Sequence, residues 1–214
     1  GSHAELAPAV PEVPLESGRL ITSRAGEMAQ IVATGAITSE IETFLSVPSG
    51  RLHQVMPDVN FAGGGAMRLE GSIHLEAGQS IWFDTFFDAA DPAPTSEGSS
   101  AFRDFAVLTV ATQGQTMVIP IADESPQVAA FGATGWQSIK YTAGVAGDYS
   151  FGFAVIDDGG VSPSVLYVDN VRSQDASGFS YAELATRHDN LGGTVGIPVP
   201  QPIATADVVT VSAG

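Results

Sequence analysis

From residue 64 onward, short runs of apolar residues alternate with runs of glycine, proline, aspartate and asparagine. Apolar runs of this length, bounded by turn-forming residues, are typical of strands in an antiparallel β-sandwich. The sequence therefore predicts a mostly β fold, a jelly-roll-like antiparallel β-sandwich. Strands are expected over 66–73, 80–87, 105–111, 116–121, 137–142, 149–156 and 165–171.

A short helical segment is expected before the first strand. Apolar residues at positions 37, 41, 44 and 45 follow the spacing of one helix face. Thr38 or Ser39 is a suitable N-cap, with Glu42 as the capping-box partner of Ser39. A second short turn is expected over 49–56, and we expect both elements to cap the β-domain.

The run 80–87 predicts which residues share a face, because side chains alternate along a strand. Phe83 and Phe87 fall on one face. The other face carries Trp82, Asp84, Phe86 and Asp88. We expect these aromatic residues, and Trp136, to belong to the core.

Proline-rich segments flank the predicted domain. Residues 4 to 18 contain three prolines and three glutamates, which is typical of an extended linker. Near the other end, three prolines precede an alternating stretch over 208–211, which resembles the first strand of another β-domain. We expect 1–3 to be an expression-tag remnant, 4–28 an N-terminal flank, 29–190 the ligand-binding sandwich, and 191–214 a linker into a following domain.

The net charge of the chain makes some classes of binding partner unlikely. Eight Lys and Arg residues against 24 Asp and Glu residues give a net charge of −16. Such an acidic protein repels nucleic-acid phosphates and anionic membrane surfaces, but it suits cations. The absence of cysteine excludes disulfides, cysteine-bound metals and thiol catalysis. The sequence contains no run of 18 apolar residues, so it predicts no membrane-spanning helix.

Acidic residues gather in three places along the chain. Asp84, Asp88, Asp91, Glu97 and Asp104 lie within one 21-residue segment. The other two groups are Asp157 with Asp158 and Asp169 with Asn170. Carboxylate and carbonyl oxygens at strand ends and loops suit Ca²⁺, which takes 6–8 oxygen ligands. The alternative is a solvated acidic surface, but several of these acids neighbour large apolar residues, where an uncompensated charge is costly.

Catalytic patterns are weaker than the metal-binding pattern. Asp104 with Asp84 or Asp88 is a possible carboxylate pair of the glycosidase kind. His53, His74 and His188 lack the spacing of a zinc pair, and no G-x-S-x-G motif is present. We therefore expect a protein that is not an enzyme.

Four stretches, 36–52, 63–87, 102–110 and 134–172, together resemble a known family. Their shared phrases are aromatic-Asp, Asp-Phe-Ala, Gly-Phe-x-Val-x-Asp and Leu-x-Val-Asp-Asn-Val. They are similar to calcium-dependent ligand-binding domains of large bacterial RTX adhesins of the biofilm and ice-binding type. Related stretches occur in PEP-CTERM-type exported proteins.

This resemblance implies a monomeric sandwich within a long multidomain adhesin on the bacterial cell surface. It implies Ca²⁺ for folding and for ligand contact, with the free carboxylate of a peptide or protein C-terminus on another cell as the ligand. The matching positions are Asp84, Asp104, Asp157 and Asp169. The chain departs from the family in the long loop 89–102, and in Arg103, where the family has Asn.

Our site prediction combines these observations. One Ca²⁺ site is expected from Asp88, Asp91, Asp104, Asp157 and Asp158, and a structural Ca²⁺ from Asp84 and Asp169. The expected ligand contacts are Asp88, Asp91, Arg103, Asp104 and Asp158. Three alternatives stay open: a calcium-dependent, lectin-like carbohydrate-binding module, which an exposed Trp82 or Trp136 would favour; a structural spacer; and a glycoside hydrolase.

Overall fold

The computed structural model describes residues 21, 23, 28–57, 60–69, 71–89, 104–123, 133–159 and 162–174. It also gives the backbone of short strands over 4–7, 13–14, 20–21, 188–190 and 208–212. No helix among these residues is long and apolar enough to cross a membrane.

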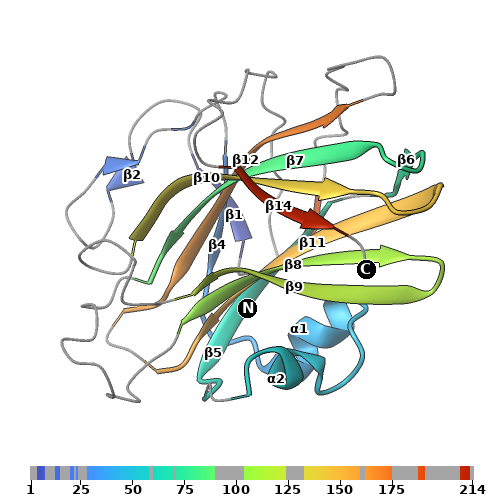
Figure 1. The fold of residues 1–214 in the computed structure, drawn as a ribbon. Coiled ribbons are helices and arrows are strands. Elements are labelled where there is room, and N and C mark those ends of the chain that lie inside the picture. Colours follow the sequence, from blue (N-terminus) through green and yellow to red (C-terminus); the bar gives the residue numbers. More distant parts are fainter. Residues whose placement is uncertain are drawn as a thin grey trace.

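Most of the described strands belong to two large β-sheets (Figure 1). The first contains, in spatial order, β1 (Ala4–Ala7), β4 (Met28–Val32), β12 (Val165–Gln174), β7 (Ser80–Asp88), β10 (Ala133–Thr142) and β14 (Val208–Ser212). The second contains β13 (His188–Asn190), β5 (Gly63–Leu69), β11 (Gly147–Asp157), β8 (Phe105–Thr112) and β9 (Gln115–Asp123), and β6 (Ile73–Leu75) pairs with β11. A small separate ribbon joins β2 (Val13–Pro14) to β3 (Leu20–Ile21). Neighbouring strands are antiparallel except β10 and β14, which are parallel.

The strand order is that of a jelly roll. The central strands of the two sheets run β4-β12-β7-β10 and β5-β11-β8-β9. With the short β6 set aside, each connection from β4 to β12 crosses to the other sheet except the β8–β9 hairpin, as in a double Greek-key sandwich. The predicted fold class, a jelly-roll-like β-sandwich with short helices, is confirmed.

The main core lies between the two sheets. Phe83 from β7 packs against Phe151 and Phe153 from β11, with ring centroids 5.2 Å apart in both pairs. Phe87 belongs to the same cluster, whereas Phe86 packs with Tyr167 in a separate cluster. The predicted alternation along β7 is therefore confirmed, and it places Asp84 on the face of the sheet away from this core.

Two short helices cover part of the outer face of the second sheet (Figure 1). They are α1 (Thr38–Phe44) and α2 (Arg51–Val55), and Ile41 of α1 packs directly on the backbone of β5. A Cβ atom at Gly64 would lie 2.5 Å from Cδ1 of Ile41, so only glycine permits this approach. The predicted helical segment is thus a cap on the outer face.

The predicted N-cap of α1 was wrong. The N-cap is Ile37, which is extended, and its N–H donates to Oε2 of Glu40 at 3.1 Å. Glu42 serves the next helix instead, because its carboxylate accepts the N–H groups of Gly50 and Leu52, both at 2.9 Å. One buried carboxylate therefore holds the start of α2 against α1.

Two strand predictions differ from the structure. The run 66–73 is divided into β5 and β6, because Gly71 adopts a left-handed conformation with φ of 78°. β4 was not predicted, although it pairs with β12 near the centre of the first sheet. β1 lies in the segment expected to be a flank, and its backbone pairs with β4.

Candidate metal centre

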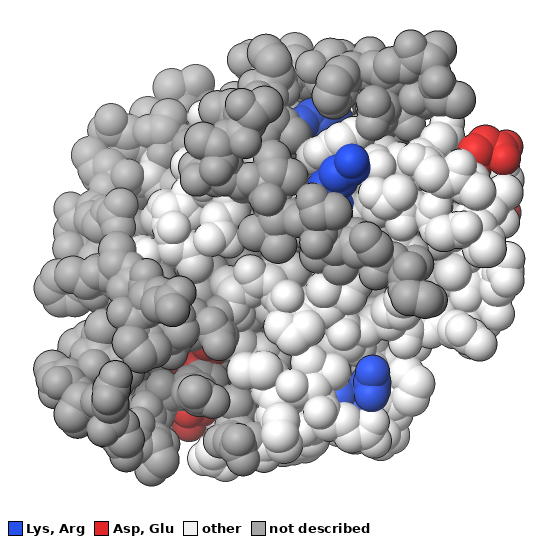
Figure 2. Space-filling model, in the orientation of Figure 1, with Lys and Arg blue, Asp and Glu red and all other residues white. Residues whose placement is uncertain are grey.

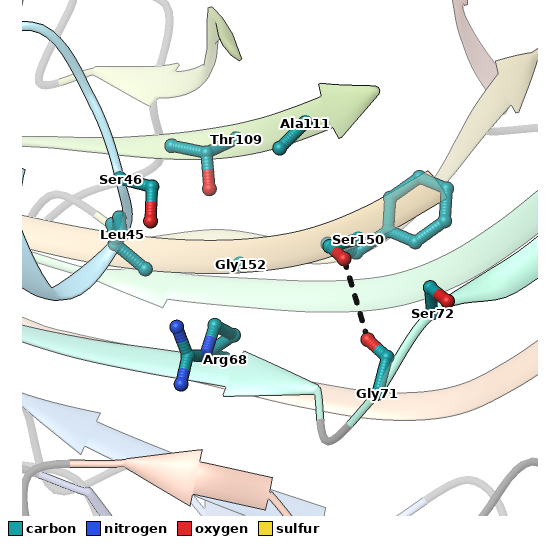
Figure 3. Close-up of a pocket in the computed structure, with 10 residues that line it drawn as sticks. Leu45, Ser46, Arg68, Gly71, Ser72, Thr109, Ala111, Ser150 and Gly152 are labelled. Atoms are coloured by element: carbon teal, nitrogen blue, oxygen red, sulfur yellow. Dashed lines mark hydrogen bonds between the residues drawn. The ribbon is translucent and has the colours of Figure 1, made fainter. Parts of the chain in front are cut away.

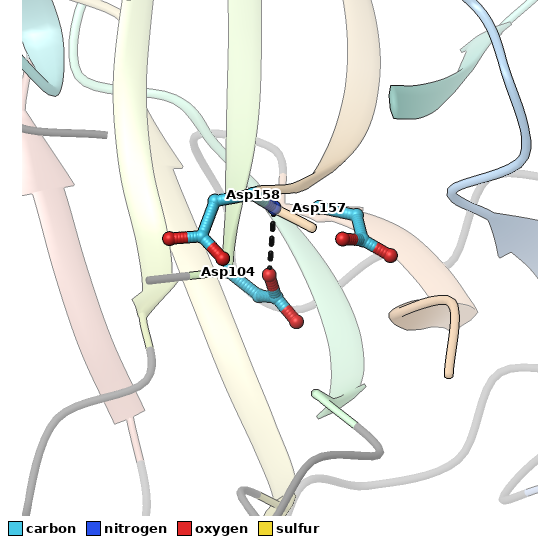
Figure 4. Close-up of side chains that lie close together, drawn as sticks. All are labelled: Asp104, Asp157 and Asp158. Carbon is cyan, nitrogen blue, oxygen red and sulfur yellow. Dashed lines mark hydrogen bonds between the residues drawn. The ribbon is translucent and has the colours of Figure 1, made fainter. Parts of the chain in front are cut away.

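Three aspartates meet where β8 begins and β11 ends. The register of these strands pairs Ile156 with Phe105, so Asp157 and Asp104 follow at the same level of the sheet. Asp158 is the next residue after β11. The three side chains are buried, and one carboxylate oxygen from each lies within 4.8 Å of the others (Figure 4).

Hydrogen bonds fix the carboxylate of Asp104 from both sides. Its Oδ1 accepts the N–H of Asp158 at 2.9 Å, and its Oδ2 accepts the hydroxyl of Ser164. The Ser164 Oγ also lies 3.1 Å from the carbonyl oxygen of Ala89, which follows β7 in the other sheet. The N–H of Gly159 donates to Oδ1 of Asp157 at 2.6 Å. The cluster therefore ties both sheets together at one end of the sandwich.

Burial makes the charge on Asp104 unfavourable. It raises the pKa of this carboxyl from an ordinary 3.8 to about 7, and the nearby carboxylates of Asp157 and Asp158 add to the rise. Hydrogen bonds from Ser164 and from the Asp158 N–H favour the ionised form, but they offset only part of the effect. A bound cation would supply the missing positive charge.

The donor set is suited to a metal ion. Carboxylate oxygens are typical ligands of hard divalent cations. Three aspartate carboxylates converge here, and the group contains no histidine nitrogen or cysteine sulfur. Within the described residues, no hydrogen bond reaches the buried Oδ1 of Asp158, although this residue has other interactions. The buried group Asp104, Asp157 and Asp158 can therefore hold a metal ion.

Asp84 has a different environment from Asp104. It forms an ion pair with Arg172, whose Nη2 lies 3.0 Å from its Oδ1, and both side chains are buried. Its carboxylate also accepts the hydroxyl of Ser138 at 2.5 Å and the side-chain amide of Asn170 at 2.8 Å. Arg172 thus provides at Asp84 the positive charge for which the sequence prediction invoked a structural Ca²⁺.

Asp169 lies opposite Asp84 in the pairing of β12 with β7. One of its carboxylate oxygens accepts the hydroxyl of Ser23 at 2.9 Å, and the other accepts the N–H of Asn170 at 2.6 Å. Asn170 sits at a break in strand register with φ of 51°, which turns its amide toward Asp84. The two acids therefore belong to one buried polar network, and Ca²⁺ binding there stays a prediction.

The remaining predicted site residues are distributed differently. Asp88 is buried at the end of β7, in the first sheet, and it does not belong to the three-carboxylate group. Asp91 and Arg103 lie outside the described residues, as does Glu97. Of the five acids assigned to one Ca²⁺ site, the structure brings Asp104, Asp157 and Asp158 together.

The tryptophans do not form an exposed aromatic platform. Trp82 is buried beneath the ammonium group of Lys140, which lies 5.3 Å from the ring centroid. Trp136 is partly buried and packs on Phe86, with ring centroids 5.8 Å apart. The exposed Trp82 or Trp136 that would favour a lectin-like module is therefore not observed.

A shallow pocket of about 370 Å³ lies on the outer face of the second sheet, beside α1 (Figure 3). Arg68, Thr109 and Ser150 line it, and Arg68 lies over the ring of Phe44. A Cβ atom at Gly152 would lie 2.6 Å from Cδ2 of Leu45, so a side chain here would clash with Leu45 at the base of the pocket. Because no carboxylate lines it, this pocket is separate from the metal centre.

Two residues of these sites, Ser164 and Arg172, were not predicted from the sequence. Ser164 is 60 positions from its partner Asp104, and Arg172 is 88 positions from Asp84. A Ser just before a predicted strand and an Arg just after it carry no distinctive pattern. Only the strand pairing brings them to the acids.

Compared with protein-family models, curated proteins and solved structures, the chain has no match in any of the three. The family expected from the sequence motifs stays a prediction.

Proposed function

We propose that the protein is a calcium-dependent ligand-binding module of a bacterial surface adhesin. The observation that carries this proposal is the buried group Asp104, Asp157 and Asp158 at one end of a jelly-roll sandwich. The ligand class comes from the sequence motifs: the free carboxylate of a peptide or protein C-terminus on another cell.

Ca²⁺ fits this group better than Mg²⁺ does. Mg²⁺ demands strict octahedral geometry and usually keeps several waters, whereas Ca²⁺ accepts 6–8 oxygens in flexible geometry. Here three carboxylates lie at the ends of strands, with Asp157 and Asp158 adjacent in sequence. Zn²⁺ and other softer metals are disfavoured because no histidine or cysteine belongs to the group.

Each aspartate has a distinct task in this proposal. Asp104 is held in place by Ser164 and the Asp158 N–H, so its orientation is set before the ion binds. Asp157 is oriented by the Gly159 N–H, and Asp158 is the first residue of the loop after β11. A Ca²⁺ ion at these residues would neutralise charge and accept an oxygen of the ligand.

The second candidate is a calcium-dependent carbohydrate-binding module. The jelly-roll strand order favours it, because lectin domains also use this architecture. Trp82 is buried and Trp136 is partly buried against Phe86, which weighs against a sugar stacked on either ring. We therefore rank it second for the metal site.

Binding arrays test the proposal. The fluorescently labelled chain is applied to peptides with free or amidated C-termini and to glycans, in CaCl₂ and in EGTA. We expect calcium-dependent binding to peptides with free C-termini, and loss of binding on amidation. Calcium-dependent binding to glycans alone would support the second candidate, and binding unaffected by EGTA would contradict both.

A further inference from the structure

The pocket beside α1 is built around one row of residues that crosses three strands. The register of β5, β11 and β8 places Arg68, Gly152 and Thr109 side by side. Residues directly opposite one another in antiparallel strands point to the same face of the sheet. Because the middle residue is glycine, a hollow separates Arg68 from Thr109. The pocket volume of about 370 Å³ lies within the range of small-molecule sites, about 300–1,000 Å³.

The hydroxyl of Thr109 faces this hollow. Thr109 is 3% exposed, and within the described residues its hydroxyl makes no hydrogen bond. A Cβ atom at Gly152 would lie 2.7 Å from Oγ1 of Thr109, so the absence of a side chain there leaves space in front of the hydroxyl. Thr109 lines the pocket, and its Oγ1 is not one of the fully enclosed atoms without a partner. Buried hydroxyls normally have a hydrogen-bond partner, which a ligand in the hollow would supply.

Arg68 supplies positive charge on the opposite side of the hollow. Its guanidinium lies 5.4 Å from the ring centroid of Phe44, and its Nη1 donates to the carbonyl oxygen of Phe44 at 3.4 Å. On its other side, Asp189 stands opposite Arg68 in the register of β13 and β5. A guanidinium has five N–H donors in a planar fork, so Arg68 can keep its protein contacts and still donate to a carboxylate.

Hydroxyl groups make up most of the remaining polar lining. Ser46, Ser72 and Ser150 line the pocket together with Thr109, and none of the lining residues is acidic. In Figure 3 the hydroxyls of Ser46 and Thr109 point toward the side of the pocket on which Arg68 lies. A ligand with one carboxylate and several hydroxyls matches this lining.

The net charge of −16 does not exclude an anion from this pocket. On the face shown in Figure 2, the described acidic side chains lie near the margins, and most of the remaining described surface is uncharged. Exposed charges more than about 8 Å apart are largely screened at physiological ionic strength. Arg68, the charged residue of the lining, therefore sets the local charge of the pocket.

We infer that this pocket binds a sugar acid, a small molecule with one carboxylate and neighbouring hydroxyls. The carboxylate accepts hydrogen bonds from Arg68, and a ligand hydroxyl pairs with that of Thr109. Asp104 lies five residues from Thr109 along β8, about 17 Å at roughly 3.3 Å per residue. The pocket is therefore separate from the metal centre, and its ligand adds to the function proposed above.

Backbone NMR of the full chain tests this inference. The ¹⁵N-labelled protein in CaCl₂ is titrated with glucuronate and galacturonate, with methyl glucopyranoside as the uncharged comparison. We expect at least one sugar acid to shift the amide signals of 44–46, 68–69, 109–111 and 150–152, and methyl glucopyranoside to bind at least tenfold more weakly. No shift in these segments would overturn the inference, and shifts confined to 104–105 and 157–159 would assign the carboxylate to the metal centre instead.

Thr109→Val separates binding from folding. Valine has a similar shape, and the hydroxyl that it removes makes no hydrogen bond within the described residues. The variant should therefore keep the wild-type Tm and bind the sugar acid about tenfold more weakly. Thr112→Val is the matched control, because it removes another hydroxyl without a hydrogen bond from β8, outside this pocket. Equal binding of the sugar acid by wild type and Thr109→Val would contradict the inference.

Arg68→Gln tests the contribution of the charge. Glutamine keeps an amide donor but removes the guanidinium, so a folded variant should bind glucuronate and methyl glucopyranoside with similar affinity. An unchanged preference for the sugar acid would contradict the role of Arg68.

A final arm keeps the two sites apart. A folded Asp104→Asn variant should bind the sugar acid as the wild type does, because no carboxylate lines the pocket. Loss of sugar-acid binding in this variant would contradict the independence of the pocket, whereas loss of calcium binding alone agrees with it.

Discussion

The N–H of Asp158 donates a hydrogen bond of 2.9 Å to Oδ1 of Asp104. This contact joins the residue before β8 to the residue after β11, and it draws three buried carboxylates into one group. Asp104 is therefore held where its charge is costly, which is the arrangement expected of a cation site rather than of a solvated surface.

Neutralising Asp104 should stabilise the metal-free protein while abolishing metal binding. In Asp104→Asn, the Oδ1 atom can still accept the Asp158 N–H, and the new amide can donate to Ser164. Because a buried charge is removed, we expect the free energy of unfolding in EGTA at pH 7.5 to rise by about 2 kcal/mol. Urea unfolding measures this change.

Asp148→Asn is the matched control. Asp148 lies on β11, the strand that pairs with β8, but its exposed carboxylate is 2.9 Å from Nδ1 of His74. The same charge change there should alter stability by no more than about 0.5 kcal/mol. Destabilisation of Asp104→Asn relative to this control would show that the Asp104 charge is already compensated.

The metal-free protein should become less stable as pH rises from about 4 to 7. The folded state keeps a proton on Asp104 up to about pH 7, whereas the unfolded chain releases it near 3.8. Between these values the folded state binds more protons, so stability falls with rising pH, by on the order of 4 kcal/mol in total. Urea unfolding in EGTA across this range measures the slope.

The comparison with Asp104→Asn isolates this group. The variant should lack the part of the slope that Asp104 contributes. If the free energy of unfolding depended on pH identically in both proteins, a group other than Asp104 would be responsible for the slope.

Calcium affinity should depend on pH in the opposite sense. An ion that binds ionised Asp104 must displace its proton below about pH 7. Titration calorimetry should therefore show affinity falling by up to about tenfold per pH unit below this value, with proton release. A constant affinity between pH 5 and pH 7 would be inconsistent with Asp104 as a ligand.

The ion pair of Asp84 with Arg172 should be structural. Arg172→Met leaves a buried carboxylate without its cation, so we expect a loss of about 3–5 kcal/mol in both CaCl₂ and EGTA. The double variant Arg172→Met/Asp84→Asn should recover part of this loss. Calorimetry should find the number of bound Ca²⁺ ions unchanged in the double variant, and a lower number would assign an ion to Asp84.

Much of the fold could be predicted from local sequence patterns. Alternation in the aromatic run of β7 placed Phe83 and Phe87 in the core, and turn-forming residues marked most strands. β4 escaped prediction because it begins at Met28, the last residue of the segment that was expected to be an N-terminal flank. The α1 cap was misplaced because extended Ile37, and not a hydroxyl-bearing residue, precedes the helix.

The site could be predicted only in part, because it depends on register. Acids at strand ends suggested a metal site, and Asp104 meets Asp157 because β8 and β11 are neighbours. Asp88 was grouped with Asp104 because the two are close in sequence; it ends β7 in the other sheet, and its part in the site stays a prediction. No local sequence pattern indicated that the guanidinium group of Arg172 would pair with the buried carboxylate of Asp84.

Thermal unfolding in CaCl₂ and in EGTA tests the central claim most directly. A ligand that binds only the folded state stabilises it by mass action. We expect Ca²⁺ to raise the Tm of the wild type and of Asp148→Asn by about ten degrees or more, which is several kcal/mol for a chain of this size. Asp104→Asn should show no such rise. An unchanged wild-type Tm, or an equal rise in Asp104→Asn, would contradict a calcium site at Asp104, Asp157 and Asp158.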